Sequence, residues 1–382
     1  MVHLALTEEQ RAIRDLAHAF AEKEIRPVAA KADKTKEFPW PTVRRMGELG
    51  FLGVNVPEQY GGAGADAVSF ALVTEEIAWG DATHMGAFGA NNSLTCAPIL
   101  RFGTEEQKQK FLVPLASGKW LGAYSLSEPS AGSDAAALKT TARREGDVYV
   151  LNGVKSWVTS GSIADLVLVY ATIDPALGSR GVTAFLVPKG TRGMTAGKVE
   201  DKMGMRASPT SELVFEDCAV PAENVLGRPG EGFKIALSTL DGGRIMSAMG
   251  ATGIARAALE DAIGYAKTRE AFGKPIANHQ AIQHMIADMA TWIDAGRLLA
   301  LKAAQLRDRG ERYTMEASVA KLLATERATQ VCLRAVQILG GAGYTREFAV
   351  ERYLRDVKVF EIFEGTSEIQ RLVIARQLGL HA

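Results

Sequence analysis

The strongest constraint on the fold is a double change in the spacing of apolar residues along the chain. Residues 1–120 repeat apolar positions every three to four residues, which is typical of amphipathic helices. Residues 121–227 contain short β-branched runs bounded by Gly, Pro or Asp, and from residue 228 the helical spacing returns. This order predicts a helical domain over 1–120, a small antiparallel barrel or sandwich over 121–227, and a helical bundle over 228–382.

Local signals predict where individual elements begin and end. Thr7 and Gln10 form a capping-box pattern before a helix over 8–31, which Pro27 is expected to help end. The pair Asn152-Gly153 between β-rich runs predicts a hairpin turn. Further helices are predicted near 41–49, 67–79 and 104–115, and further strands over 165–173, 181–188 and 212–221.

Composition excludes several classes of protein. Lys and Arg together number 44, as do Asp and Glu, so the formal net charge is zero. The chain therefore lacks the excess positive charge that would attract nucleic acid. No apolar run is long enough to span a bilayer, and the N-terminus carries Glu8 and Glu9 without the apolar centre of a signal peptide. We therefore expect a soluble cytoplasmic protein with no membrane insertion. The three cysteines, Cys96, Cys218 and Cys332, lack metal-site spacing, so we expect inert buried thiols and no metal.

One segment near the C-terminus has the composition of a catalytic site. Glu361 and Glu364 lie among three large apolar residues, and an apolar environment raises the pKa of a carboxyl group. Such a carboxylate suits the role of general base for a carbon acid. The alternative is an ordinary helix start, capped by Thr366 or Ser367, with Glu364 exposed to water.

Three other segments have the composition of cofactor surfaces. Residues 124–134 form a loop rich in hydroxyl groups, which can bind a polar heterocycle or a phosphate. Trp157 and Thr159 end a strand on one face and would suit a flat conjugated ring. The glycine-rich turn at 337–341 allows close approach to a nucleotide. The alternatives are turn chemistry, a core tryptophan and a helix C-cap.

Taken together, the segments resemble one family, the acyl-CoA dehydrogenases, over nearly the whole chain. The resemblance implies an N-terminal α-helical domain, a middle antiparallel β-barrel and a C-terminal four-helix bundle. The eight segments that carry it, in order, are FGTEEQKQKFL at 102–112, YSLSEPSAGSD at 124–134, WVTSG at 157–161, KMGMRASPTSELVFEDCAVP at 202–221, LDGGR at 240–244, TREAFGKPI at 268–276, QILGGAGY at 337–344 and EIFEGTSEIQRLVIAR at 361–376.

The resemblance also implies an activity. Members of this family use FAD to oxidise an acyl-CoA thioester to the trans-2-enoyl-CoA, in fatty acid β-oxidation or amino-acid catabolism. Glu364 matches the base that removes the α-proton, while the β-hydrogen leaves as hydride to flavin N5. Electrons then pass to electron-transferring flavoprotein. The implied assembly is a homotetramer, a dimer of dimers.

Site residues carry over position by position from the resemblance. The residues implied to hold the flavin of the same chain are Tyr124, Leu126, Ser127, Ser133, Trp157, Val158, Thr159, Thr366, Ser367 and Glu368. Those implied to reach the FAD of the neighbouring protomer are Arg269, Gln280, Gln337, Ile338, Leu339, Gly340 and Gly341, and Phe272 is a further implied FAD contact. Those implied to contact the CoA ester are Ser133, Asp241, Gly242, Gly243, Arg244 and Gly365.

Some positions restrict which residue can be the base and which acyl groups the chain is expected to accept. A few branched-chain members carry the base at the position of Gly243, so here only Glu364 can serve. The LDGGR and EGTSEIQ segments look most like short-chain, butyryl-type members, although Phe363 replaces a frequent Tyr. No Lys or Arg lies between His84 and Leu100, so a dicarboxylic acyl group lacks a counter-ion. The alternatives are a medium-chain dehydrogenase, an acyl-CoA oxidase or other flavin enzyme that uses oxygen, and a non-catalytic helical binding protein.

Overall fold

The computed structural model describes residues 5–380 and begins with one long, bent helical run. It consists of α1 (Glu8–Phe20), the π-helical turn η1 (Ala21–Ile25) and α2 (Arg26–Thr35). Thr7 and Gln10 form the predicted capping box. The prediction that Pro27 ends the helix was wrong, because the helical run continues through Pro27, which lies in the first turn of α2 directly after the π-helical turn η1. The run ends instead at Lys36, whose φ is +62°.

The rest of the N-terminal region is also helical, and much of it is buried. All residues of α4 are buried, and α5, η4 and α6 follow it as a helical stretch that the spacing of apolar residues did not predict. A helix buried on all sides has no polar face and therefore no amphipathic period. The elements are α3 (Trp40–Glu48), η2 (Phe51–Gly53), η3 (Glu58–Tyr60), α4 (Ala67–Gly80), α5 (Ala82–Gly89), η4 (Ala90–Cys96), α6 (Ala97–Phe102), α7 (Glu105–Gln107), η5 (Lys108–Leu112) and α8 (Val113–Ala116).

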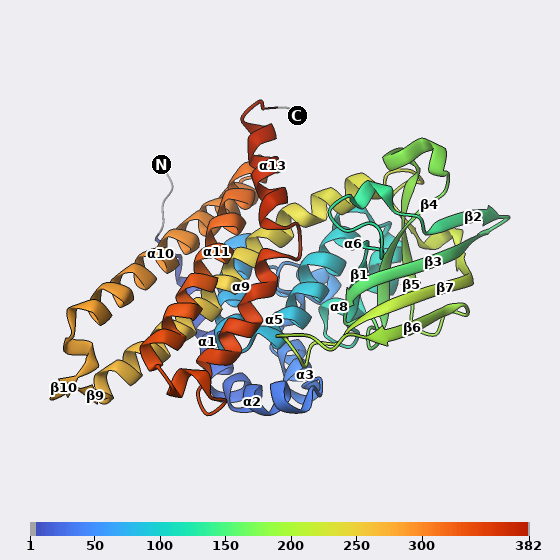
Figure 1. Ribbon diagram of the computed structural model, residues 1–382. Helices are drawn as coiled ribbons and strands as arrows, with labels where there is room; N and C mark the ends of the chain where they lie inside the picture. The colour runs from blue at the N-terminus through green and yellow to red at the C-terminus, as the bar shows by residue number, and fades with distance from the viewer. Residues whose placement is uncertain (1–4, 381–382) are drawn as a thin grey trace.

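The middle region forms a mixed sheet at one end of the molecule (Figure 1). Its strand order is β6-β7-β3-β2-β4-β5-β8; β1 and β2 each pair with β4 in parallel, so the sheet is not antiparallel throughout. Among the described residues the end strands β6 and β8 do not pair, so a closed barrel is not confirmed. The elements are β1 (Gly122–Ser125), η6 (Ala135–Ala137), β2 (Thr141–Glu145), β3 (Val148–Thr159), β4 (Leu166–Thr172), η7 (Pro175–Gly181), β5 (Val182–Pro188), β6 (Met194–Val199), β7 (Thr210–Pro221), η8 (Ala222–Asn224) and β8 (Val225–Leu226).

The predicted hairpin turn at Asn152-Gly153 was wrong, because β3 continues through this pair. The turn lies one strand earlier, between β2 and β3, where Gly146 has a φ of +60°. Gly153 instead marks a shift in the register of β3 against β7. A Cβ on Gly153 would lie 2.6 Å from the hydroxyl oxygen of Thr140, so this glycine permits a bulge and a close backbone approach.

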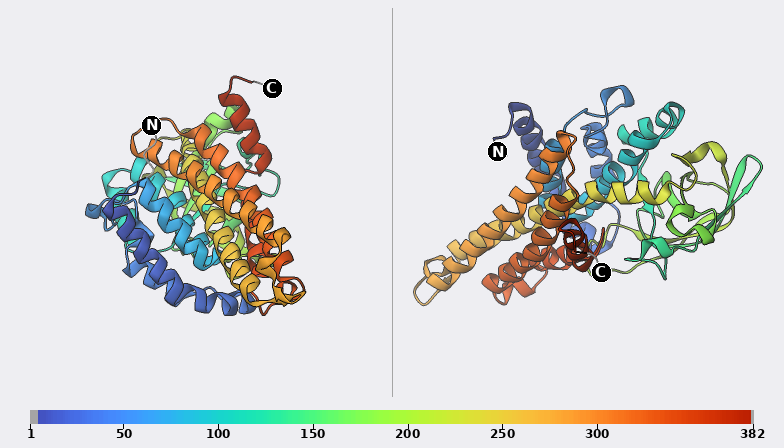
Figure 2. Two further views of the ribbon diagram at one scale, coloured as in Figure 1. Left: turned by 90° about the vertical axis from the view of Figure 1, so that its left-hand side faces the viewer. Right: turned by 90° about the horizontal axis from the view of Figure 1, so that it is seen from above.

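The C-terminal region consists mainly of three long helices, α9, α10 and α11, which lie side by side (Figure 2). The 37-residue helix α9 packs on α4 and reaches the sheet through β5, so it links all three regions of the chain. The elements are α9 (Gly232–Thr268), β9 (Glu270–Ala271), β10 (Lys274–Pro275), η9 (Ile276–Asn278), α10 (Gln280–Asp308), α11 (Thr314–Leu339), η10 (Ala342–Tyr344), α12 (Val350–Val357), η11 (Lys358–Glu361) and α13 (Ser367–Gln377).

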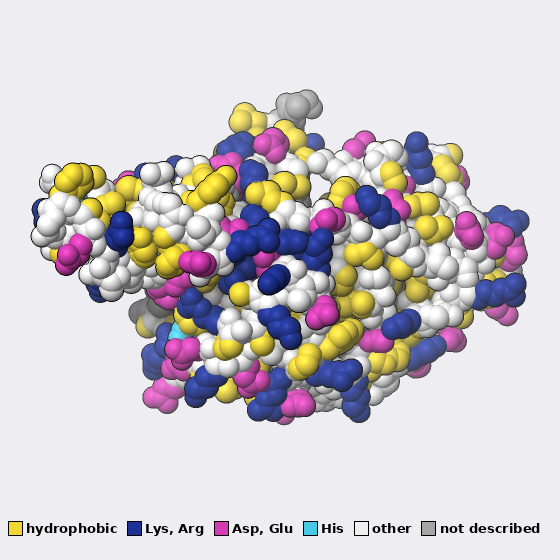
Figure 3. Space-filling view, turned by 60° about the horizontal axis from the view of Figure 1, so that its bottom comes forward, with side chains coloured by type: hydrophobic (Ala, Val, Ile, Leu, Met, Phe, Trp, Pro, Cys, Tyr) yellow, Lys and Arg dark blue, Asp and Glu magenta, His cyan; other side chains and the backbone are white. Residues whose placement is uncertain are grey.

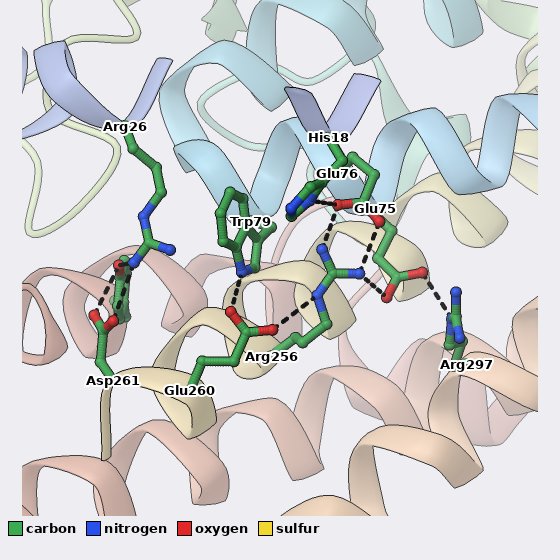
Figure 4. A network of polar contacts seen from close by, with 10 residues as sticks. His18, Arg26, Glu75, Glu76, Trp79, Arg256, Glu260, Asp261 and Arg297 are labelled. Carbon is green, nitrogen blue, oxygen red and sulfur yellow. Dashed lines mark hydrogen bonds and ion pairs between the residues drawn. The ribbon is translucent and has the colours of Figure 1, made fainter. Parts of the chain in front are cut away.

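Charged residues as well as apolar ones hold α4 against its neighbours (Figure 4). Glu75 and Glu76 of α4 are both buried, and the guanidinium of Arg256 on α9 binds both carboxylates. Arg297 of α10 donates to Glu75 at 2.8 Å, and the ring of His18 on α1 contacts Glu76 at 2.8 Å. This cluster, which we call the Arg256 network, joins four helices through fully paired charges.

Candidate active site

The turn between η11 and α13 places Glu364 in an unusual backbone conformation. Glu364 has a φ of +53° and Gly365 a φ of +92°, so two successive residues lie in the left-handed region. Thr366 then caps α13, because its hydroxyl accepts a hydrogen bond from the Ile369 N–H at 3.3 Å. Positive φ is uncommon for a residue other than glycine and is concentrated at functional sites.

The carboxyl group of Glu364 is buried without a hydrogen-bond partner. Its Oε2 atom is inaccessible and accepts no hydrogen bond from any residue in the range 5–380. Burial raises the pKa of Glu364 to about 7, although the charges of Lys321 and Arg244 oppose this rise. Of the two alternatives for this segment, the helix cap at Thr366 is present, but Glu364 is partly buried and its Oε2 atom is inaccessible to water.

Glu361 has very different surroundings from Glu364. Its carboxylate accepts a hydrogen bond from the Thr329 hydroxyl at 2.5 Å and forms an ion pair with Lys358 at 2.9 Å. A carboxylate held by two donors has little freedom to approach a ligand. Of the two acidic residues in the segment, therefore, only Glu364 is free to accept a proton.

Helix α9 faces Glu364 with a glycine. A Cβ atom on Gly243 would overlap the Glu364 Oε2, so only glycine leaves room for the carboxyl group. The next residue, Arg244, is buried and forms an ion pair with Asp241. Asp241 also accepts a hydrogen bond from the Thr314 hydroxyl at 2.9 Å, which ties α9 to the start of α11.

The loop after β1 is held in place by a buried ion pair. Lys155 of β3 is fully buried and donates to Glu128 at 2.8 Å and to the Leu126 carbonyl at 3.1 Å. Glu128 also accepts hydrogen bonds from the backbone N–H groups of Lys139 and Thr140. The hydroxyl-rich loop predicted from the sequence is therefore fixed on the sheet domain.

Trp157 is not a core residue. It is 63% exposed, has a φ of +62° and lies within a bulge where the register of β3 against β7 shifts. Because the bulge breaks the alternation of side chains, strand periodicity cannot place Trp157 and Thr159 on one face. An exposed indole beside the loop at 124–134 offers a flat apolar surface to a ligand.

The remaining residues of the first predicted cofactor group range from buried to exposed. Leu126, Val158 and Ser367 are buried, Tyr124, Ser127, Thr159 and Thr366 are partly buried, and Ser133 and Glu368 are exposed. Burial raises the pKa of Tyr124 well above 10, with contributions from Tyr170 and from Glu364, so Tyr124 and Glu364 lie within electrostatic reach. The Ser367 hydroxyl is buried and lacks a hydrogen-bond partner in the described chain.

The second predicted cofactor group lies at the opposite end of the molecule from the sheet (Figure 1). Arg269 and residues 338–341 line one hollow of about 380 Å³, together with Tyr265, Ile276 and Ala342. Gln280 begins α10, Gln337 is exposed near the end of α11, and Phe272 at the β9–β10 tip is 95% exposed. The two groups therefore do not meet within one chain.

Sequence reasoning missed two residues beside Glu364. Lys321 of α11 and Gln370 of α13 are both buried, and both donate to the Gly365 carbonyl at 2.8 Å. The available signal was the position of Lys321, four residues after Ala317 on the apolar face of α11. A lysine on such a face requires a buried partner.

Other features of the surface and interior carry less information. Lys and Arg side chains gather near the middle of the face in Figure 3. A hollow of about 340 Å³ is lined by Asp201, Lys202, Met203, Arg206, Arg346 and Arg355, but Arg355 is already paired with Asp33 and Glu351. Within residues 5–380, no His, Cys, Asp or Glu cluster could hold a metal, and no helix is long and apolar enough to cross a membrane. All three cysteines are buried and free.

Comparison with known proteins places these features in a family. Three family models match: the acyl-CoA dehydrogenase N-terminal domain over residues 7–119, the middle domain over 123–218 and the C-terminal domain over 230–379. The bovine mitochondrial short-chain specific acyl-CoA dehydrogenase is 50% identical over 373 residues, covering 98% of this chain and 90% of the relative.

Two solved structures have nearly the same fold. Butyryl-CoA dehydrogenase from Megasphaera elsdenii superposes with a TM-score of 0.97 at 45% identity, covering 99% of this chain and 100% of the other. A chain in the structure of the electron transferring flavoprotein of Acidaminococcus fermentans, from work on flavin-based electron bifurcation, gives a TM-score of 0.98 at 48% identity, covering 99% of each chain.

Proposed function

The chain belongs to the acyl-CoA dehydrogenase family, and from that premise we propose that Glu364 removes the α-proton of a short-chain acyl-CoA ester. The reaction of the family is FAD-dependent dehydrogenation of the acyl group. The observation that carries the role of Glu364 is its Oε2 atom, which is buried and has no hydrogen-bond partner among residues 5–380. The paired Glu361 could not serve without breaking its two contacts.

The surroundings of Glu364 suit proton abstraction at neutral pH. A pKa of about 7 lets the carboxylate form be present while keeping it a stronger base than an exposed glutamate. The same dry environment strengthens each electrostatic interaction with the substrate. Neutralisation of the carboxylate by the α-proton removes a charge that burial disfavours, so the transfer itself is assisted by the site.

The backbone at Glu364 provides a second element of catalysis. Among the hydrogen bonds of the described chain, none uses the Glu364 N–H, so this donor is available to a ligand. We assign it to the thioester oxygen, where it would stabilise the enolate-like charge that develops as the α-proton leaves. The left-handed turn at residues 364–365 then presents a base and an oxyanion donor from one short segment.

The residues of the first predicted cofactor group fit the flavin of FAD, the cofactor that solved relatives bind. The exposed Trp157 offers a flat wall, and the buried Ser367 hydroxyl is an unsatisfied polar group in the described structure. Ser127, Thr159 and Thr366 supply further hydroxyl groups around the same region. When bound, the flavin supplies the acceptor for the β-hydrogen.

The acyl group is short and uncharged in this proposal. The relatives that match over the whole chain include short-chain and butyryl-CoA enzymes. The segment from His84 to Leu100 contains no Lys or Arg, and His84 is buried in a contact with Asp81 at 2.8 Å. A second carboxylate on the substrate would therefore be desolvated there without a cationic partner, which costs several kcal/mol.

An anaerobic titration with a panel of acyl-CoA esters, followed by flavin bleaching, tests this proposal. Reduction should be most efficient with butyryl- or isobutyryl-CoA, several-fold weaker with octanoyl-CoA and negligible with glutaryl-CoA. A maximum at octanoyl or longer would contradict the short-chain assignment but not the dehydrogenase activity. Strong bleaching by glutaryl-CoA would show that a cation from outside residues 84–100 reaches the acyl end.

The assembly and the electron acceptor complete the proposal. Because the β9–β10 tip and the turn at 337–341 lie at the end opposite the sheet, whereas Trp157 and Thr159 lie on the sheet, we assign Arg269, Phe272, Gln280 and the turn at 337–341 to the FAD of a neighbouring protomer. The proposed assembly is a homotetramer built as a dimer of dimers, and the acceptor is electron-transferring flavoprotein. Light scattering of the FAD-loaded protein should give an oligomer; a monomer that holds FAD tightly would contradict this assembly.

A further inference from the structure

We propose that Lys321 is a positioning residue for the reaction: it anchors the turn that carries Glu364 and holds that base in its charged form. This inference rests on the proposed role of Glu364 as the base. It concerns a residue of α11 that lies 43 positions before Glu364 in the sequence and is brought to the turn only by the packing of α11 against α13.

The geometry at the Gly365 carbonyl supports the anchoring role. The Lys321 ammonium group and the Gln370 side-chain amide each donate to this oxygen at 2.8 Å. Glu364 and Gly365 both have positive φ; for Glu364, which is not a glycine, this conformation costs free energy and persists only where the surroundings hold it. Two donors on one carbonyl fix the position of the Gly365–Thr366 peptide, one residue after the base.

The burial of Lys321 indicates more than an anchoring role. Its side chain is fully buried, and Gln370 shows that a neutral amide already reaches the same oxygen. A buried ammonium group costs several kcal/mol unless it is paired. Among the nearby carboxylates, Glu364 offsets the largest part of this cost. The base is therefore the main partner of the Lys321 charge.

The charged groups around this pair come from every neighbouring element. Arg244 of α9 faces both Glu364 and Lys321, and Tyr124 of β1 lies within electrostatic reach of Glu364. Glu361 of η11 and Glu368 of α13 also act on Lys321. Arg244 is already paired with Asp241, and Glu361 with Lys358, which leaves Lys321 as the cation without another ion-pair partner in the described structure.

A matched pair of variants separates charge from anchoring. Lys321→Met removes the ammonium group and one donor to Gly365, whereas Gln370→Met removes a neutral donor that bonds the same oxygen at 2.8 Å and the Glu364 carbonyl at 3.4 Å. Both are purified with FAD, checked by flavin absorbance, and assayed for kcat/KM with butyryl-CoA from pH 5 to 9. In the plot of kcat/KM against pH, the midpoint of the rising part, here called the ascending limb, reports the pKa of the base in the free enzyme. A merely structural role of Lys321 would not move this midpoint.

Lys321→Met should move the ascending limb to higher pH by about one unit or more, because an opposite charge at this range lowers a carboxyl pKa by roughly that amount. The rate near pH 6 should therefore fall roughly tenfold and recover above pH 8. Gln370→Met should lower the rate at every pH and leave the limb in place. A limb at the wild-type pH in Lys321→Met overturns the proposal, whatever its rate.

Two further proteins keep the test decisive. If Lys321→Met does not retain FAD, Lys321→Gln must show the same shift, and a limb at the wild-type pH in that variant overturns the proposal. Glu364→Gln tests the premise separately: flavin reduction that persists in Glu364→Gln defeats the role of Glu364 itself. An unshifted Lys321 variant with an inactive Glu364→Gln defeats only the role of Lys321.

Discussion

Two sites that lie against α9 contain buried carboxyl oxygens, and they differ in hydrogen bonding. One site is the pair Glu75 and Glu76, and the other is Glu364. In the Arg256 network, the carboxylates of Glu75 and Glu76 are covered by guanidinium and imidazole groups (Figure 4). Burial alone would raise the pKa of Glu76, but hydrogen bonds and charge from Arg256 hold it below its usual value. The carboxyl of Glu364 has no such bonds, and burial raises its pKa to about 7.

The difference shows how the same burial can serve structure or chemistry. A carboxylate with two or three donors is locked in its charged form and ties helices together. A carboxylate with nearby cations but no direct donor keeps a pKa within the physiological range and can take up and release a proton. The contrast lies in direct hydrogen bonds rather than in the depth of burial or in the presence of cations.

Glu364→Gln should give the largest effect, because it removes the base while keeping the shape of the side chain. Substrate-dependent flavin reduction should fall by roughly 10²- to 10⁴-fold or more, with FAD content unchanged. Stopped-flow measurement with butyryl-CoA checks this. Glu361→Gln is the control and should retain most of the rate; the reverse pattern would place the base at Glu361.

Arg256→Met should destabilise the fold without altering the chemistry. It leaves Glu75 and Glu76 buried with fewer partners, which costs roughly 3–5 kcal/mol in the free energy of unfolding. Urea unfolding of the holoenzyme measures the loss. Arg371→Met, which breaks an exposed pair with Glu326, is the control and should cost at most about 1 kcal/mol. Equal losses in the two variants would contradict the importance of the network.

The Arg256 network also predicts a dependence of stability on acid. Because the folded-state pKa of Glu76 is lowered, its contribution to stability is present above the unfolded-state pKa near 4.5 and is lost as the pH falls through the folded value. The unfolding free energy of wild type should therefore fall more steeply below pH 5 than that of Arg256→Met. Parallel curves would mean that Arg256 does not stabilise the charged form of Glu76.

Gly243→Ala should displace the Glu364 carboxyl group by steric overlap. The added Cβ would occupy the position of the Glu364 Oε2, so the carboxyl group must move. A misplacement of about 1 Å can cost roughly 10²-fold in rate. Gly264→Ala, on the same helix with open space around its Cβ, is the control and should leave the rate unchanged. Unchanged flavin reduction in Gly243→Ala would show that the base works from another position.

Local signals in the sequence predicted much of the fold but failed where distant contacts decide. The capping box at Thr7 is present, because it depends on residues three positions apart. Asn152-Gly153 and Pro27 were misread, because their roles depend on Thr140 across the sheet and on the continuation of the helix into α2. A turn residue has several uses, and only its neighbours in space select one.

The candidate site also contains features that adjacent residues predict and features that depend on distant residues. The apolar surroundings of Glu364 are visible in adjacent residues, so its raised pKa was predicted from sequence. Lys321 lies far away in the chain, and the Arg256 network joins residues about 180 positions apart, so neither pairing leaves a local pattern. The roles of the predicted cofactor residues remain proposals, since they depend on a bound ligand and on a second protomer.

The pH dependence of flavin reduction tests the central claim that Glu364 is a base kept free of direct hydrogen bonds. The rate constant for reduction by limiting butyryl-CoA is measured anaerobically from pH 5 to 9 in wild type. Because the base must be deprotonated, the rate should rise about tenfold per pH unit at low pH and level off near pH 7, matching the pKa of about 7 for Glu364. A limb near pH 4.5, or a rate independent of pH across this range, would contradict the account.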